Sequence, residues 1–310
     1  MVVEPVGFVG LGNLGSKLAA SLLRAGYPLT LHDLDRTRAR PLLEAGASWA
    51  ETPRAAASGA ATVITCLPSP AAVAAVVEGA DGVLAGLAPG SVWIDTSTND
   101  RDEAARLAAL AAEHGIGCLE APVTGGVHKA ADGSITVLVG GDEELFRAKR
   151  PLLASFGDPV IHLGPLGNAA LVKVATNMLA FVHLVAVGEA LMLAKRGGVD
   201  LRDAFEAIRA SSGNSFVHET ESQVILNGSY DIGFTLDLAV KDLGFALSLG
   251  EELGVPLEVA ELVARRFDRA HETYGGAAWS PMVVRLLEEA VGEDLRAPGF
   301  PARLGDGAPA

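Results

Sequence analysis

The N-terminal stretch constrains the fold of this chain more than any other. An apolar run, Val6–Val9, leads into Gly10-Leu11-Gly12-Asn13-Leu14-Gly15, and a helical pattern follows. This order predicts a βαβ unit that binds a dinucleotide. Gly10 allows a sharp turn, Gly12 allows backbone amides to approach a pyrophosphate, and Gly15 allows the helix to pack closely on the strand. The start of that helix then faces the anion.

A carboxylate follows at the distance that this unit requires. A second apolar run ends at Asp33, about 20 residues beyond the glycines, where a carboxylate accepts hydrogen bonds from the adenosine ribose hydroxyls. Its charge favours NAD over NADP, although Arg36 and Arg38 follow closely enough to hold a 2′-phosphate. We therefore expect Gly10 to Gly15, together with Asp33, to bind NAD or NADP.

Composition is typical of a soluble enzyme of two domains. The chain has 310 residues, of which 49% are hydrophobic, enough for more than one core. Its formal net charge of −14 argues against a surface for nucleic acid or for an anionic membrane. Cys66 and Cys118 both lie in apolar runs, which favours buried, reduced thiols. With no leader sequence apparent, we expect a cytoplasmic protein.

Strand-like and helical runs alternate over the first half of the chain, and helical periodicity follows. The strand-like runs are Ala61 to Leu67, Val92 to Asp95, Gly117 to Ala121, Ile135 to Val139 and Val160 to Leu163. This alternation predicts an α/β fold class: an N-terminal Rossmann-type doubly wound sheet over residues 1–164. Residues 165–296 are expected to form an all-α C-terminal domain, joined to the sheet by a long helix. Residues 297–310 have the composition of a flexible tail.

The long helix is expected to run from near Leu166 to about Arg196. Its apolar stretch contains Lys173, Asn177 and further polar residues at intervals that a lipid-facing helix would not carry, so we expect a buried helix and no membrane span. Lys173 and Asn177 are four residues apart and share one face. A lysine among apolar neighbours is costly to bury, so Lys173 is either a catalytic group or a lysine whose charge reaches solvent or a carboxylate of the next helix.

Two strand ends add polar groups. The run Glu120 to Gly126 ends in Thr124-Gly125-Gly126, which either forms a nest of amides for a substrate carboxylate or is only a tight turn. The run Asp95 to Thr98 leaves the carboxyl edge of the sheet, where open α/β folds bind ligands. There we expect Ser97 to contact the substrate and Thr98 the cofactor, unless these hydroxyls only cap the next helix.

Taken together, these segments resemble the β-hydroxyacid dehydrogenase family, which includes 3-hydroxyisobutyrate dehydrogenase and tartronate semialdehyde reductase. The likeness covers nearly the whole chain, in order: the glycine signature, Asp95 to Thr98, Ala121 to Gly141, Gly164 to Asn177, and Lys241-Asp242-Leu243. Three departures leave the chemistry unchanged and bear on the substrate: Ala169 in place of a glycine, Thr124 in place of a serine, and His128-Lys129 before Ala130.

The resemblance implies a role for each matching position. Lys173 becomes the catalytic lysine, Asn177 its companion at the substrate, and Thr124 to Gly126 the carboxylate site. Lys241 would approach both nicotinamide and substrate, and Leu67-Pro68 would line the cofactor groove. For Lys241 the alternative is a surface ion pair with Asp242 or Asp237, worth under about 1 kcal/mol. No metal site is implied.

The function that fits is reversible NAD(P)-dependent hydride transfer to or from a small 3-hydroxy acid, with Lys173 as general acid and base. The alternatives are reduction of tartronate semialdehyde or succinic semialdehyde, imine reduction, and a dinucleotide sensor without catalysis. The related 6-phosphogluconate dehydrogenases, which decarboxylate, carry His-Asn where this chain has Thr176-Asn177. We also expect a homodimer or a homotetramer, because the long apolar helix needs covering.

Overall fold

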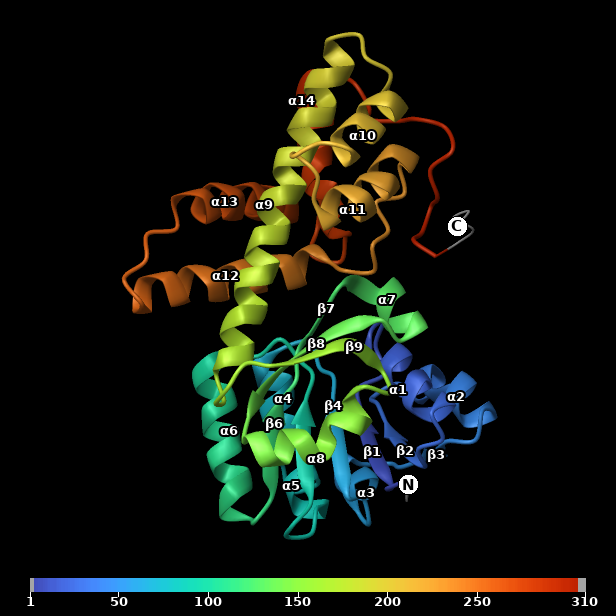
Figure 1. Cartoon of the computed structure of the whole chain (residues 1–310), viewed down its shortest axis with the longest axis vertical. Helices are drawn as coiled ribbons and strands as arrows, with labels where there is room; N and C mark the ends of the chain where they lie inside the picture. The colour runs from blue at the N-terminus through green and yellow to red at the C-terminus, as the bar shows by residue number, and fades with distance from the viewer. Residues whose placement is uncertain (1–2, 306–310) are drawn as a thin grey trace. The chain divides into compact units, whose positions relative to one another are not determined.

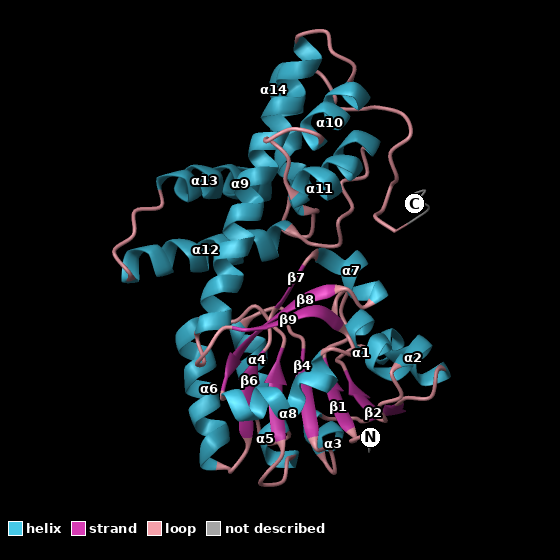
Figure 2. Ribbon diagram, viewed as in Figure 1, coloured by secondary structure: helices cyan, strands magenta, loops and turns pink. Residues whose placement is uncertain are grey.

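The computed structural model describes residues 3–305, shown in Figure 1 by chain position and in Figure 2 by secondary structure. These residues divide into a first compact unit that ends at Lys173 and a second that begins at Val174. The division falls inside helix α9 (Asn168–Arg196), which has 29 residues and matches the long helix expected from near Leu166 to Arg196. The expected fold class, a Rossmann-type sheet followed by a helical domain, is confirmed.

The first unit is built on one nine-stranded sheet, whose strands are drawn in magenta in Figure 2. Its strands are β1 (Val6–Val9), β2 (Leu29–His32), β3 (Ser48–Trp49), β4 (Thr62–Thr65), β5 (Val92–Asp95), β6 (Gly117–Glu120), β7 (Val123–Thr124), β8 (Ile135–Gly141) and β9 (Gly157–His162). Their order is β3-β2-β1-β4-β5-β6-β8-β7, and β9 pairs with β8. All pairs are parallel except β6–β8 and β7–β8, so the expected mostly parallel sheet is confirmed.

Helices cover both faces of this sheet. They are α1 (Gly15–Arg24), η1 (Arg36–Ala39), α2 (Arg40–Glu44), α3 (Pro53–Ala57), α4 (Pro70–Glu78), α5 (Val83–Gly86), α6 (Arg101–Glu113), α7 (Gly126–Asp132) and α8 (Glu143–Leu153). Side chains alternate between two apolar clusters along the strands: in β5, Val92 and Ile94 join the cluster under α1 and α8, whereas Trp93 joins the one under α4 and α6. Burial on both faces explains why the central strands β1, β4 and β5 are buried over their whole length.

The second unit is helical around its own apolar cluster, as expected. After α9 come α10 (Leu201–Arg209), α11 (Phe216–Asn227), α12 (Leu236–Glu252), α13 (Glu258–Tyr274), η2 (Ser280–Val284) and α14 (Arg285–Val291). Gly198, Gly228, Gly254 and Gly275 have positive φ and lie within two residues of the ends of α9, α11, α12 and α13, because glycine ends a helix where backbone with positive φ is needed. Gly228, with a φ of 92°, ends α11 in this way.

The C-terminal segment contacts the second unit over its described part, and the flexible tail expected for residues 297–310 stays a prediction. The Ala297 amide donates to Leu226 O at 3.0 Å, and the Phe300 ring packs edge-on against Phe205 with centroids 5.0 Å apart. The Pro, Gly and Ala composition of this segment does not reveal that Phe300 packs on the second unit. Residues 306–310 lie outside the described part of the chain.

Helix α9 is long and apolar enough to cross a membrane by length and composition alone, with a mean hydropathy of 1.8 over its most apolar window. One third of that window is buried within this chain. Phe181, Leu184 and Leu191 belong to the apolar core of the second unit. The buried helix expected from the sequence is therefore buried only in part within this chain.

Candidate active site

The turn after β1 contains two glycines that the chain's own packing requires. Gly10 has a φ of 99°, and a Cβ there would lie 2.3 Å from Cys66 O. A Cβ on Gly15 would lie 2.1 Å from Gly10 O. Neither position can hold a side chain without moving β1, β4 or α1 apart. Both expectations for these glycines, a sharp turn and close packing of the helix, agree with this geometry.

Gly12 differs, because no described residue occupies the space that its side chain would take. The nearest atom to its Cβ position is Arg38 Nη1, at 3.7 Å, and its φ is not in the left-handed region. Helix α1 has no side-chain cap at its start and no acidic residue in its first turn. An open approach to a helix start without a capping side chain fits the pyrophosphate of a dinucleotide. Of its neighbours in the motif, Leu11 is buried and Asn13 is exposed.

Asp33 lies at the end of β2 and contacts this turn directly. Its Oδ2 accepts the Leu11 amide at 2.6 Å, and its Oδ1 accepts the Asp35 amide at 2.8 Å. Each carboxylate oxygen keeps a further lone pair for a ribose hydroxyl. Arg38 lies beside the turn while pairing with Asp35 at 3.6 Å. The carboxylate and the glycine turn are therefore held together before any ligand binds.

The ends of β4 and β5 are joined through Ser97. Its hydroxyl donates to Asp95 Oδ1 at 2.6 Å and accepts the Leu67 amide at 2.9 Å, and the residue is only 5% exposed. Its one proton is therefore donated inside the sheet, and the contact of Ser97 with the substrate stays a prediction. Leu67 and Pro68 follow β4 and Thr98 follows Ser97 at the carboxyl edge; Leu67 and Thr98 are half-buried and Pro68 is exposed.

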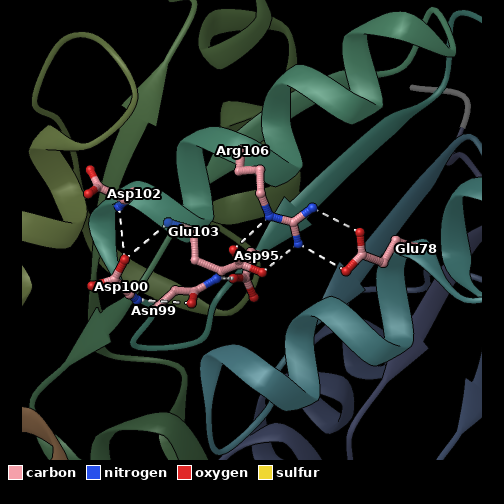
Figure 3. A network of polar contacts seen from close by, with 7 residues as sticks. All are labelled: Glu78, Asp95, Asn99, Asp100, Asp102, Glu103 and Arg106. Carbon is pink, nitrogen blue, oxygen red and sulfur yellow. Dashed lines mark hydrogen bonds and ion pairs between the residues drawn. The ribbon is translucent and has the colours of Figure 1, made fainter.

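Asp95 organises that edge. It also accepts the Thr65 hydroxyl at 2.8 Å and the Asn99 amide at 3.3 Å, the latter drawn in Figure 3. Burial raises the pKa of Asp95 despite these donors. Figure 3 also shows Asp100 capping α6, and Arg106 joining α4 to α6 through exposed ion pairs that contribute little stability.

The expected carboxylate site is a turn between β7 and α7. Thr124 is half-buried, and Gly125 and Gly126 have φ values of 123° and 90°. A Cβ on Gly125 would lie 3.2 Å from Lys129 Cδ, and one on Gly126 would lie 3.0 Å from His128 Cε1. Burial lowers the pKa of His128, and the charge of Lys129 lowers it further. His128 and Lys129, which together form one departure from the family pattern, thus lie directly against the glycines.

Lys173 ends the first unit and is 8% exposed, next to Val174, which is 3% exposed. An ammonium at such a position costs several kcal/mol unless other groups compensate for the lost water. Asn177 lies one helical turn further along α9, so both residues lie on one face of this helix.

In the second unit one carboxylate binds both expected residues. Asp242 of α12 accepts Asn177 Nδ2 at 2.6 Å through Oδ2 and Lys241 Nζ at 2.6 Å through Oδ1. The Asp242 side chain is 1% exposed and that of Lys241 20%. The alternative for Lys241 was a surface ion pair with Asp242 or Asp237. Lys241 does pair with Asp242, but this carboxylate is buried, and Asp237 pairs with His271 instead.

Sequence reasoning missed two organising carboxylates, Glu120 and Asp242. Glu120, at the end of β6, accepts the amides of Gly167 and Ala169 at the start of α9, each at 2.8 Å. In the sequence, these two residues stand out only as acids within the segments Glu120-Ala121-Pro122 and Lys241-Asp242-Leu243. In the described part of the chain, no group of three or more His, Cys, Asp or Glu residues could hold a metal ion.

This fold and site define a class: an oxidoreductase that binds a nicotinamide dinucleotide on a Rossmann-type unit and carries a helical second unit. A family model described as the NAD binding domain of 6-phosphogluconate dehydrogenase matches residues 5–164. A second, described as the NAD-binding domain of NADP-dependent 3-hydroxyisobutyrate dehydrogenase, matches residues 167–287. The chain belongs to the β-hydroxyacid dehydrogenase family, whose members are NAD(P)-dependent and act on CH–OH donors.

Three relatives illustrate the likeness. The 2-(hydroxymethyl)glutarate dehydrogenase of Eubacterium barkeri is 32% identical, over 93% of this chain and 96% of its own length. The NAD-dependent L-serine dehydrogenase of Pseudomonas aeruginosa is 37% identical, over 79% and 84%. The structure of Mycobacterium tuberculosis 3-hydroxyisobutyrate dehydrogenase with L-serine is similar with a TM-score of 0.82 and 30% identity, over 92% and 99%. A solved imine reductase from a Pseudomonas species, at 21% identity, shares the fold alone.

Proposed function

We propose that this chain reversibly oxidises the hydroxyl of a small 3-hydroxy acid with NAD, and that Lys173 is its general acid and base. The observation that carries the proposal is Lys173 itself, a lysine 8% exposed on the helix that leaves the dinucleotide-binding unit. Burying an ammonium costs free energy, and a lysine without a chemical role avoids this cost by extending into solvent.

Each residue then has a defined part in the reaction. When bound, the nicotinamide dinucleotide supplies the two-electron oxidant or reductant. During oxidation, Lys173 Nζ accepts the hydroxyl proton as the hydride leaves the carbinol carbon; during reduction it returns the proton. The amides of the turn at Thr124 to Gly126 hold the substrate carboxylate. Asn177 orients the substrate, and Lys241 contacts both substrate and nicotinamide.

The names of the relatives support a common substrate pattern. Serine, 3-hydroxyisobutyrate and 2-(hydroxymethyl)glutarate each carry a hydroxymethyl group on the carbon that bears a carboxylate. They differ only in the second substituent of that carbon. We therefore propose a 3-hydroxy acid with a primary hydroxyl and a variable substituent at C2 as the substrate class.

Steady-state oxidation of a panel of acids tests this function. The panel contains 3-hydroxypropionate, 3-hydroxyisobutyrate, serine and 2-(hydroxymethyl)glutarate, each with NAD and with NADP, and the reverse reaction is measured with tartronate and succinic semialdehydes. We expect turnover of at least one acid, and NAD preferred. Reduction of a cyclic imine with no turnover of any acid or semialdehyde would contradict the proposal.

Asp33 is expected to set the preference for NAD. Replacing Asp33 with Ala removes the acceptor for the ribose hydroxyls and should weaken NADH binding by about tenfold or more, since a hydrogen bond to a charged group contributes roughly 1.5–3 kcal/mol. NADPH binding should weaken less. Fluorescence titration of both cofactors measures the change.

Two further variants separate ligand contact from loop support. Asp33→Asn keeps an oxygen for the Leu11 amide and should lie between the wild type and Asp33→Ala. Asp35→Asn is the matched control, since Asp35 is an exposed carboxylate that accepts the Thr37 amide nearby. Unchanged NADH affinity in Asp33→Ala would remove the basis for the assignment.

We also propose that the protein is a homo-oligomer, a dimer or a tetramer, in the cytoplasm. Leu179 and Leu193 of α9 are 50% and 76% exposed, and Val259 and Leu262 of α13 are 59% and 54% exposed. A second copy would remove such apolar surface from water. Sedimentation velocity measures the assembly directly, and a monomer at micromolar concentration would contradict it.

A further inference from the structure

The start of α9 is held by a residue far away in the sequence. Glu120 Oε1 accepts the backbone amides of Gly167 and Ala169, both at 2.8 Å. Asn168, the first residue of the helix, points its side-chain amide back to the preceding segment, donating to Leu163 O at 2.7 Å. A helix start leaves four amides without helical partners, so the carboxylate of Glu120 satisfies amides of this kind.

The sheet holds Glu120 rigidly in this position. It is the last residue of β6, it is 5% exposed, and it lies opposite Gly140 of β8 in the antiparallel pair. A Cβ on Gly140 would lie 2.1 Å from Glu120 Oε1. Only glycine at residue 140 leaves room for the carboxylate to turn toward α9.

The second carboxylate oxygen of Glu120 gains no compensation for its lost water from the described residues. Oε2 is buried and has no hydrogen-bond partner among the described residues. The side chain lines a small cavity, with room for roughly one water molecule, together with Asp95, Asn99 and Cys118. Burial raises the pKa of Glu120, and the nearby charge of Asp95 adds to this, while the bonds from α9 oppose it. At this costly site, the contact with α9 is what the Glu120 carboxyl contributes to the fold.

We propose that Glu120 is a positioning residue, which fixes the first turn of α9 and thereby the place of Lys173. The inference rests on the proposed function, in which Lys173 moves the proton. In a regular α-helix the amide of Lys173 donates to the carbonyl of Ala169, so the contact from Glu120 lies one turn before the lysine. Misplacement of a reacting group by about 1 Å can cost roughly 100-fold in rate.

Two variants of Glu120 test the proposal. Glu120→Ala removes the acceptor, and we expect kcat to fall by about 10- to 100-fold, with the KM for the acid and the affinity for NADH within about threefold of wild type. Glu120→Gln keeps an oxygen that can accept both amides, and we expect kcat within about threefold of wild type. This rescue by the conservative variant, and the effect on kcat alone, would not follow from a general loss of stability.

Hydrogen exchange supplies a readout that needs no substrate. The amides of residues 167–173 should exchange faster in Glu120→Ala and at the wild-type rate in Glu120→Gln. Asp142→Ala is the matched control, because Asp142 is also a carboxylate cap in this unit, accepting the Leu145 amide of α8 at 2.8 Å. It should change neither kcat nor exchange at residues 167–173. If Glu120→Ala does not fold, Gly140→Ala displaces the same oxygen by a second route.

The possible failures are distinguishable. Wild-type kcat in Glu120→Ala, or unchanged exchange at residues 167–173, would overturn the positioning role while leaving the proposed function intact. Equal loss in the Ala and Gln variants would overturn it too, since the acceptor oxygen would then not be what matters. If the wild type oxidises no acid, the proposed function fails, and exchange of the Lys173 amide still decides whether Glu120 holds this turn.

Discussion

Replacing Lys173 with Met is expected to lower kcat by about 10²–10⁴-fold, the usual contribution of a general acid or base. This corresponds to roughly 3–5 kcal/mol of transition-state stabilisation. Methionine has a similar length and suits the apolar surroundings of a site that is 8% exposed, so the fold and NADH affinity should be unchanged. Steady-state kinetics on the best acid of the panel, with NADH titration in parallel, measures both quantities.

A control and a rescue make this result specific. Lys149→Met removes another lysine of the first unit, whose side chain is 12% exposed and pairs with Glu4 at 2.8 Å, and its kcat should stay near wild type. Primary amines added to Lys173→Ala should restore part of the turnover, because a free amine can take the place of the missing base. Wild-type turnover in Lys173→Met with NADH bound normally would exclude Lys173 as the acid and base.

The second large effect is expected at Asp242. Asp242→Ala leaves Lys241 without its 2.6 Å partner and Asn177 without its acceptor, in a site where the lost carboxylate was 1% exposed. Removing one partner of a buried pair typically costs about 3–5 kcal/mol. We therefore expect a clear fall in thermal stability, together with a loss of kcat/KM of tenfold or more, because both side chains lose their orientation.

Calorimetry and kinetics on the full chain measure these changes. The matched control is Asp237→Ala on the same helix, since that side chain is 65% exposed and pairs with His271 at 2.7 Å. An exposed pair contributes under about 1 kcal/mol, so the control should be nearly silent. An Asp242→Ala protein as stable and as active as the control would show that the carboxylate does not organise Asn177 and Lys241.

The fold was predictable from the sequence wherever a local pattern carried it. The glycine turn with Asp33, the alternation of strands and helices, and the breaks such as Asn227-Gly228 all depend on residues close together in the chain. The two-residue strands β3 and β7 are too short to show a period, and strand direction leaves no local mark, so the antiparallel β8 was not predicted.

The site was predictable in part, for the same physical reason. Residues with a motif of their own, such as Lys173 and the turn at Thr124, could be named, and their roles remain proposals. Glu120 contacts amides 47 and 49 residues away, and Asp242 contacts Asn177 across 65 residues. No spacing rule in one sequence reveals such pairs. Ser97 shows the converse: a hydroxyl in a well-matched motif is used inside the sheet.

The three glycines of the first turn answer to different constraints, and this matters for how such a motif is interpreted in other chains. Gly10 and Gly15 would be required of any strand-turn-helix this tight, with or without a ligand, whereas the space beside Gly12 serves nothing within the protein. A chain with the outer two glycines and a bulky residue in the middle would be expected to keep this architecture without binding a dinucleotide. The middle glycine is therefore the one that indicates nucleotide binding, whereas the outer two indicate only a tight strand-turn-helix.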